Sequence, residues 1–299
     1  MAPTDPGPGP VLVARKWVDR RPTVDLLTGE VSTDPRSSGA SEADEAALEW
    51  GLRLAGVWGV GVLAVTAGPP DAEAVLRPAL AAGAGGAVRI DLTSPPGHLA
   101  GGAPSSRAVA SALALVARTA GSRMVLCGDL SLDRGSGAVP AFLAGELGAA
   151  QGLGLVSLAP DPDRPGHLGA WRRLDGGRRE ELALAPPWVC SVEGGTARLR
   201  RAELAGVLAA GRAPVEVVTA ETSGPAPPHP ARTGPGRPRT HLLTGPDPTA
   251  DARHRILALT GALVERTPPL TLTLGPGEGA DRILEALRAW GELPGEEFP

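Results

Sequence analysis

A loop rich in glycine, serine and aspartate is the segment of this sequence best suited to chemistry. It spans residues 128–137 and follows the short apolar run 124–127. Between a strand and a helix, such a loop presents backbone N–H groups and a helix N-terminus, which together hold phosphate. The same residue types occur in strand-to-helix loops for turn geometry alone. The loop therefore predicts a phosphate site only when other features support it.

Arrangements typical of hydrolases and kinases are missing. The sequence has no Gly-x-Ser-x-Gly elbow, no His-Glu-x-x-His and no Gly-Lys-[Ser/Thr] loop, and Gly275-Pro-Gly-Glu-Gly279 lacks the lysine of a Walker loop. The histidines do not pair with Ser or Asp at a recognisable spacing. Asp129 and Asp133 have no third ligand nearby that would complete a metal site. We therefore expect a protein that is not an enzyme and holds no metal.

The composition is that of a globular protein with extensive loops. Of 299 residues, 41 are glycine and 32 are proline, while 42% are hydrophobic and 21% are charged. These proportions exclude a coiled coil, a fibre and a bundle of membrane helices. The formal net charge of −4 provides no basic surface for nucleic acid and no polybasic membrane anchor. We therefore expect a protein or small-molecule partner and no nucleic acid.

Signals for export or membrane insertion are not recognisable. The first ten residues have neither a basic region nor a long apolar run, and the longest uncharged stretch, 54–70, ends in two prolines. Cys127 and Cys190 lie in apolar runs, so we expect buried, reduced thiols. These features predict a cytoplasmic protein that does not insert directly into a membrane.

Short apolar runs alternate with amphipathic segments through the first half of the chain. This rhythm predicts a parallel sheet with helices on its faces. Ser41, followed three residues later by Asp44, resembles a capping box at the start of a helix. Pro78 predicts a kink or a short helix. The expected strands are 11–14, 60–66, 87–90 and 124–127, and the expected helices are 41–55, 71–82 and 105–119.

The second half has a different pattern. Strand-like residues 172–174 and 181–184 flank the turn Asp175-Gly176-Gly177 and predict a hairpin. A strand at 188–192 and a short helix at 203–210 follow. Residues 240–293 predict a small α/β appendage, with strands at 241–244 and 270–274 and helices at 250–265 and 280–290. The predicted parts are thus a disordered tail (1–10), an α/β domain (11–216), a proline-rich linker (217–239) and the appendage (240–293).

The order of these segments resembles the beta subunit of electron transfer flavoproteins over residues 11–216. Arg15-Lys16, after the first strand, is similar to the basic pair near the start of that family's sequences, and Thr28-Gly29 stands where the family turns a short hairpin. The most specific element is Arg172-Arg173-Leu174-Asp175-Gly176-Gly177, followed by Glu180, Leu182 and Pro187, which resembles the family's hairpin signature.

This resemblance implies a Rossmann-like, three-layer α/β/α core with a parallel sheet. It also implies an adenine nucleotide, AMP or a second FAD, bound to this chain, and a redox FAD shared with an alpha subunit. The residues that it assigns to the nucleotide are Val13, Ser41, Ala67, Gly128, Asp133, Ser136, Gly137 and Val139, the last group holding phosphate through backbone N–H donors.

The resemblance also implies protein partners. Leu204 stands where the family has a leucine in the loop that recognises dehydrogenases. The preceding cluster of Arg198, Arg200 and Arg201 would meet an acidic partner surface and accelerate association, or would form a solvated charged edge. Electrons would pass from a donor dehydrogenase through the flavin to a membrane quinone reductase.

Some positions depart from the family's pattern. Gly85 and Gly135 replace acidic residues, Ala138 replaces a glutamine, and Arg20 stands where an aromatic residue approaches the flavin. The extra C-terminal residues and the arginine-rich composition resemble a divergent branch that accompanies the mycofactocin redox system. The alternative function is a stand-alone adenine-nucleotide-binding regulatory module on the same core.

Overall fold

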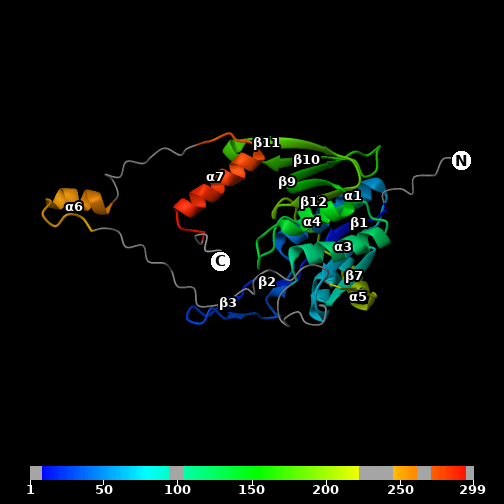
Figure 1. Ribbon diagram of the computed structural model, residues 1–299. Helices are drawn as coiled ribbons and strands as arrows, with labels where there is room; N and C mark the ends of the chain where they lie inside the picture. Colours follow the sequence, from blue (N-terminus) through cyan, green and yellow to red (C-terminus); the bar gives the residue numbers. More distant parts are fainter. Residues whose placement is uncertain (1–8, 94–103, 222–244, 261–270, 294–299) are drawn as a thin grey trace, which may run out of the picture. The chain divides into compact units, whose positions relative to one another are not determined.

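The computed structural model describes residues 9–93, 104–221, 245–260 and 271–293 (Figure 1). The chain divides into two units, residues 1–236 and 237–299. Most of the predicted tail and of the predicted linker lies outside the described residues. The linker's first residues, through 221, belong to strand β13 (Glu216–Glu221).

The first unit is built on one nine-stranded sheet with the order β11-β10-β9-β12-β8-β1-β6-β7-β13. From β9 through β12 to β13 all neighbouring strands are parallel, whereas β9, β10 and β11 pair antiparallel. Its other strands are β1 (Val11–Ala14), β6 (Val62–Ala67), β7 (Gly86–Thr93), β8 (Met124–Gly128), β9 (Ala150–Pro160), β10 (Leu168–Arg173), β11 (Arg179–Leu184) and β12 (Trp188–Val192).

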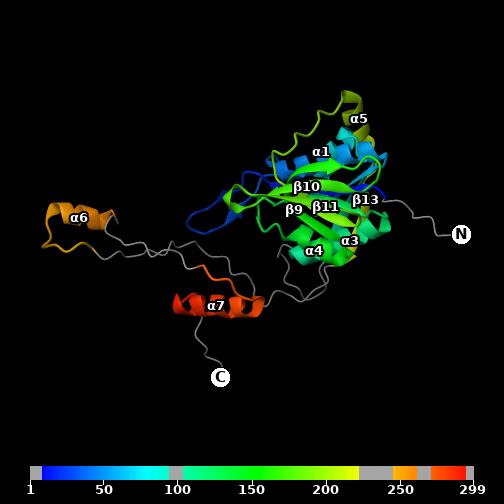
Figure 2. The same ribbon diagram turned by 90° about the horizontal axis from the view of Figure 1, so that it is seen from above.

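Helices cover both faces of this sheet (Figure 2). Helices α1 (Glu42–Trp58) and α2 (Leu76–Ala82) share one apolar core with the sheet, and α3 (Ser106–Thr119) and α4 (Ala138–Leu147) share a second core on the other face. Helix α5 (Leu204–Arg212) packs on α2. The three-layer α/β/α fold predicted from the sequence is confirmed.

Helix α1 begins where the sequence predicts. The Ser41 hydroxyl accepts the backbone N–H of Asp44 at 3.1 Å, and Gly59 ends the helix in the left-handed conformation. Gly51 lets the helix approach β1 closely, because a Cβ atom there would lie 2.6 Å from Cγ2 of Val13. The cap fixes where α1 begins, and the glycine lets the middle of the helix pack against β1.

Pro78 divides its segment as expected. A 3₁₀ turn (Pro70–Val75) precedes α2, and Pro78 is the third residue of that helix. In the first turn a proline removes no intrahelical hydrogen bond, so the short helix tolerates it.

Three hairpin-like pairings complete the first unit. Strands β10 and β11 pair around the turn Asp175–Gly177, which confirms the predicted hairpin with longer strands. Near the N-terminus, β2 (Val18–Asp19) pairs with β5 (Ser38–Gly39), and β3 (Thr23–Val24) pairs with β4 (Val31–Ser32) around Thr28-Gly29.

The described part of the second unit is helical, with α6 (Ala252–Leu259) and α7 (Pro276–Ala289). The predicted strand at 270–274 is wrong for residues 271–274, which are irregular. An apolar run becomes a strand only when another strand pairs with it, and the described residues of this unit contain none. The predicted strand at 241–244 and the helix residues 261–265 lie outside the described residues. Among the helices that the structure describes, none has the length and hydropathy to cross a bilayer.

Candidate functional site

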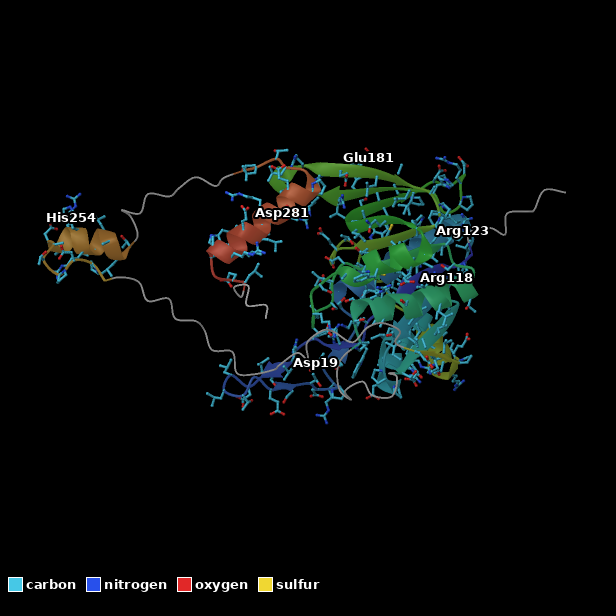
Figure 3. The ribbon with its side chains drawn as sticks, viewed as in Figure 1. Asp19, Arg118, Arg123, Glu181, His254 and Asp281 are labelled. Atoms are coloured by element: carbon cyan, nitrogen blue, oxygen red, sulfur yellow. The ribbon has the colours of Figure 1, made fainter. Side chains whose placement is uncertain are left out.

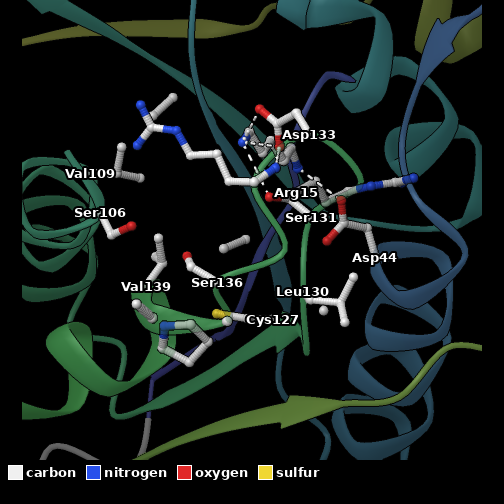
Figure 4. Close-up of a pocket in the computed structure, with 18 of the residues that line it drawn as sticks. Arg15, Asp44, Ser106, Val109, Cys127, Leu130, Ser131, Asp133, Ser136 and Val139 are labelled. Carbon is white, nitrogen blue, oxygen red and sulfur yellow. Dashed lines mark hydrogen bonds and ion pairs between the residues drawn. The ribbon is translucent and has the colours of Figure 1, made fainter. Parts of the chain in front are cut away.

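A cavity of about 320 Å³ opens at the carboxyl ends of β1, β6 and β8 (Figure 4). From β1 the chain proceeds through α1 to β6 on one side, and it later returns through α3 to β8 on the other. The cavity therefore lies at the point where the strand order reverses, which is the usual ligand site of open α/β sheets.

The loop from β8 to α4 forms one wall of this cavity. Gly137 is the N-cap of α4, has φ of 58°, and contributes no side chain to cap the helix. A Cβ atom at Gly137 would lie 2.8 Å from the carbonyl oxygen of Asp129. Because this position requires glycine, the N–H groups of Ala138 and Val139 at the start of α4 have no side-chain cap and can donate hydrogen bonds to an anion.

An ion pair joins this loop to the end of β1. Nζ of Lys16 lies 2.6 Å from both carboxylate oxygens of Asp133 and 3.3 Å from Oγ of Ser131. Burial alone would raise the pKa of Asp133, but the hydrogen bonds from Lys16 and Ser131 outweigh it and hold that pKa below its ordinary value. Both side chains of the pair remain about 40% exposed.

Arg15 and Asp44 are buried charged residues that also line the cavity. Within the described part of the chain, Nε and Nη1 of Arg15 have no hydrogen-bond partner. The buried hydroxyl of Thr66 has none there either. Arg15 and Thr66 directly follow Ala14 and Val65, which pair between β1 and β6. Oδ2 of Asp44 accepts the backbone N–H of Lys16 at 3.0 Å. Burial raises the pKa of Asp44 and lowers that of Arg15. Polar groups that lack partners thus gather at this end of the sheet.

Two further groups at the cavity have perturbed acidity. Burial and the neighbouring charge of Glu193 raise the pKa of Asp129. Burial raises the pKa of the Cys127 thiol to about 12, so the sulfur is not a nucleophile at neutral pH. Cys127 and Cys190 are both free and buried, as predicted.

The structure brings most of the residues predicted for the nucleotide to this cavity. Two are not among its lining residues, because Val13 belongs to the core beneath α1 and Ser41 caps that helix. The six that line the cavity are Ala67, Gly128, Asp133, Ser136, Gly137 and Val139.

Sequence reasoning assigned no cavity role to Arg15, Lys16 or Asp44. The signal for Arg15 and Lys16 was their position directly after a strand of the parallel sheet, where side chains face a ligand site. Asp44 lies in the first turn of α1, a position where an acidic residue is common for helix stability alone.

The predicted recognition residues lie elsewhere on the unit. Leu204 is the first residue of α5 and is 75% exposed. Arg198 and Arg201 are exposed. Arg200 is exposed too, but its guanidinium binds the buried carboxylate of Glu49 on α1, with Nε 2.9 Å from Oε2, and so fastens this segment to the core.

Metal-binding geometry is not found in the described residues, which contain no group of three or more His, Cys, Asp or Glu side chains that could hold an ion. His254 lies exposed on α6, where Nδ1 is 2.7 Å from Oδ2 of Asp251 (Figure 3). This exposed pair caps the start of that helix and forms no site.

A comparison with protein-family models identifies the family of the chain. The family model described as "electron transfer flavoprotein domain" matches residues 31–223. The match covers α1, the β8–α4 loop and the hairpin of β10 and β11. No curated protein matches the chain.

Proposed function

Because the chain belongs to the electron transfer flavoprotein family, we propose that it is the beta subunit of such a flavoprotein. Together with an alpha subunit it forms a flavin site that carries electrons from a dehydrogenase to a respiratory acceptor in a mycofactocin-linked system. The observation that carries the proposal is the cavity at the strand ends, within a chain that this family model matches over most of its length.

The residues of the cavity fit an adenine mononucleotide. The uncapped start of α4 and the guanidinium of Arg15, of which Nε and Nη1 have no partner among the described residues, suit a phosphate. Val109, Leu113 and Val139 provide apolar surface for a base. A volume of about 320 Å³ is at the lower end of the range for ligand sites, which favours AMP over a second FAD.

The flavin itself would be shared with the alpha subunit, and its isoalloxazine ring would accept and release the electrons. This chain's part is to hold and shield that group and to present docking surfaces. Arg20, which stands where the family has an aromatic residue, donates from Nε to the carbonyl oxygen of Ser37 at 3.3 Å. A guanidinium held in this way would place positive charge near a reduced flavin, which carries negative charge.

Dehydrogenase recognition would use the start of α5. Arg77 of α2 donates to the carbonyl oxygens of Ala210 and Ala213 and so holds the end of that helix. On the outer face, Leu204, Val207 and Leu208 are exposed. Such an apolar patch beside the cations Arg198 and Arg201 suits a partner that has an apolar pocket with an acidic rim.

Co-expression with the candidate alpha subunit tests the main proposal. A stoichiometric complex with a flavin absorption spectrum and one additional AMP is the expected result. A stable, colourless monomer that binds adenine nucleotide without the alpha subunit would contradict it and would favour the stand-alone regulatory module.

Two matched glycines test the nucleotide site within that complex. Gly137 and Gly148 lie at opposite ends of α4 with φ of 58° and 59°, but only a Cβ at Gly137 would meet other atoms. Gly137→Ala should therefore release the bound AMP, whereas Gly148→Ala should retain it, as measured by nucleotide content. Equal AMP content in the two variants would contradict the site.

The recognition surface needs its own comparison. Leu204→Ala should slow flavin reduction by the donor dehydrogenase about tenfold, a loss in the range of a single interface anchor. Leu115→Ala, which changes an exposed leucine on α3, is the control and should have no effect. Equal rates for the two variants would exclude α5 as the docking surface.

A further inference from the structure

Lys16 is the only lysine of this chain, and it lies at the end of β1 on the rim of the cavity. Its ammonium group reaches across to the β8–α4 loop, where it binds Asp133 and Ser131. The ion pair therefore links the two sequence segments that flank the cavity.

Asp133 is poorly suited to a phosphate site unless its charge is neutralised. It lies in the same loop as Ser136 and Gly137, and all three line the cavity. A carboxylate and a phosphate in one cavity repel each other. In the structure Lys16 neutralises Asp133, and the backbone N–H of Arg134 also donates to it at 2.9 Å.

A phosphate would compete with Asp133 for the same cation. The pair is about 40% exposed on each side, and ion pairs of that exposure contribute little to stability because solvent screens them. Lys16 can therefore leave Asp133 at low cost. Its long side chain carries a single compact charge that can turn from one anion to another.

We propose that the Lys16–Asp133 ion pair is a latch on the cavity, which a ligand phosphate opens by taking Lys16 away from Asp133. Asp133 then turns to solvent, and the β8–α4 loop loses its link to β1. This inference rests on the proposed nucleotide site and adds a regulatory contact to it: the phosphate, and not the base, changes the state of the loop.

Binding of AMP and adenosine to the complex of this chain with its alpha subunit tests the latch, because the two probes differ only in the phosphate. In titration calorimetry, Lys16→Met should weaken AMP binding at least tenfold, and Asp133→Asn should tighten it about fivefold. Adenosine affinity should stay unchanged in both variants. Asp161→Asn, which breaks an exposed ion pair with Arg164, is the control and should bind both probes as the wild type does.

The outcomes separate the latch from the site. If Asp133→Asn weakens AMP binding or leaves it unchanged, Asp133 does not compete with phosphate and the latch is wrong. If Lys16→Met weakens adenosine as much as AMP, Lys16 only supports the cavity and the latch is also wrong. If the wild type binds neither probe, the proposed nucleotide site itself is overturned, and the latch with it.

Amine labelling gives a second readout, since Lys16 is the one side-chain amine of the chain and its peptide can be followed by mass spectrometry. In Asp133→Asn the ammonium loses its carboxylate partner, so AMP should slow labelling of Lys16 at least threefold, whereas adenosine should not. Equal protection by the two probes would contradict the transfer of Lys16 to phosphate.

Discussion

Helix α1 carries two buried carboxylates, Asp44 and Glu49, in opposite surroundings. Glu49 accepts Nε of Arg53 at 2.8 Å and Nε, Nη2 and the backbone N–H of Arg200 at 2.9, 3.1 and 3.1 Å. Asp44 accepts the backbone N–H of Lys16 and is also hydrogen-bonded to Ser41, but no arginine in the described part of the chain binds it as Arg200 binds Glu49. The nearby guanidinium of Arg15 makes no ion pair with Asp44, and two of the nitrogens of that guanidinium have no partner among the described residues.

The pKa values of the two carboxylates reflect this difference. Burial acts to raise both, but the hydrogen bonds from Arg200 and Arg53 outweigh it at Glu49 and lower that pKa, whereas at Asp44 burial dominates and the pKa is raised. A buried charge with all its partners supports the structure, while one that lacks them indicates a site completed by a ligand. Glu49, which Arg53 and Arg200 bind, is therefore assigned to stability. Arg15, two of whose guanidinium nitrogens have no partner among the described residues, is assigned to the cavity, with the hydrogen-bonded Asp44 beside it.

Removing Glu49 should have the largest effect on stability. Glu49→Ala leaves Arg200 and Arg53 without their acceptor and removes one of the contacts that join α1 to the segment before α5. The expected loss in the free energy of unfolding is about 3 kcal/mol, measured by urea denaturation. Glu181→Ala, at an exposed position on β11, should cost less than about 0.5 kcal/mol.

A double-mutant cycle assigns this loss to the pair. Arg200→Ala and the double variant with Glu49→Ala should give a coupling energy of about 1 to 2 kcal/mol. Additive losses would mean that the two side chains act separately, and Glu49 would no longer contrast with Asp44.

The sequence predicts the elements that depend on neighbours along the chain. Ser41 and Asp44 predict the start of α1, and Asp175-Gly176-Gly177 predicts the hairpin, because capping and turn chemistry act within a few residues. Residues 271–274 show the limit, since a strand needs a partner and the apolar pattern does not say whether one exists. The cavity contacts could not be predicted, because Lys16 and Asp133 are 117 positions apart and no periodicity links them.

Replacing Arg200 and Arg15 by methionine tests the same comparison, with smaller expected changes in the free energy of unfolding. Arg200→Met removes hydrogen bonds to a buried carboxylate and should cost about 2 kcal/mol. Arg15→Met removes a buried charge whose Nε and Nη1 lack partners among the described residues. It should change the free energy of unfolding by less than about 1 kcal/mol, because the lost attraction to Asp44 and Glu45 is offset by relief of the cost of burying an incompletely hydrogen-bonded charge. Equal losses in urea denaturation would show that Arg15 is as firmly paired as Arg200.

The smallest effects are opposite pH dependences at the two carboxylates. Because the pKa of Glu49 is lowered in the folded protein, its contribution is present above the unfolded value of about 4.3 and is lost as the pH falls through the folded value. The pKa of Asp44 is raised, so the folded state binds the extra proton, and stability falls as the pH rises from about 3.9 through the folded value.

The stability difference between wild type and Glu49→Gln should therefore increase with pH, and the difference between wild type and Asp44→Asn should decrease. Each slope is at most about 1.4 kcal/mol per pH unit for one proton, measured by urea denaturation between about pH 3 and 7. Slopes of the same sign would mean that one carboxylate has the other's surroundings, and the division of α1 into a supporting end and a ligand-binding end would fail.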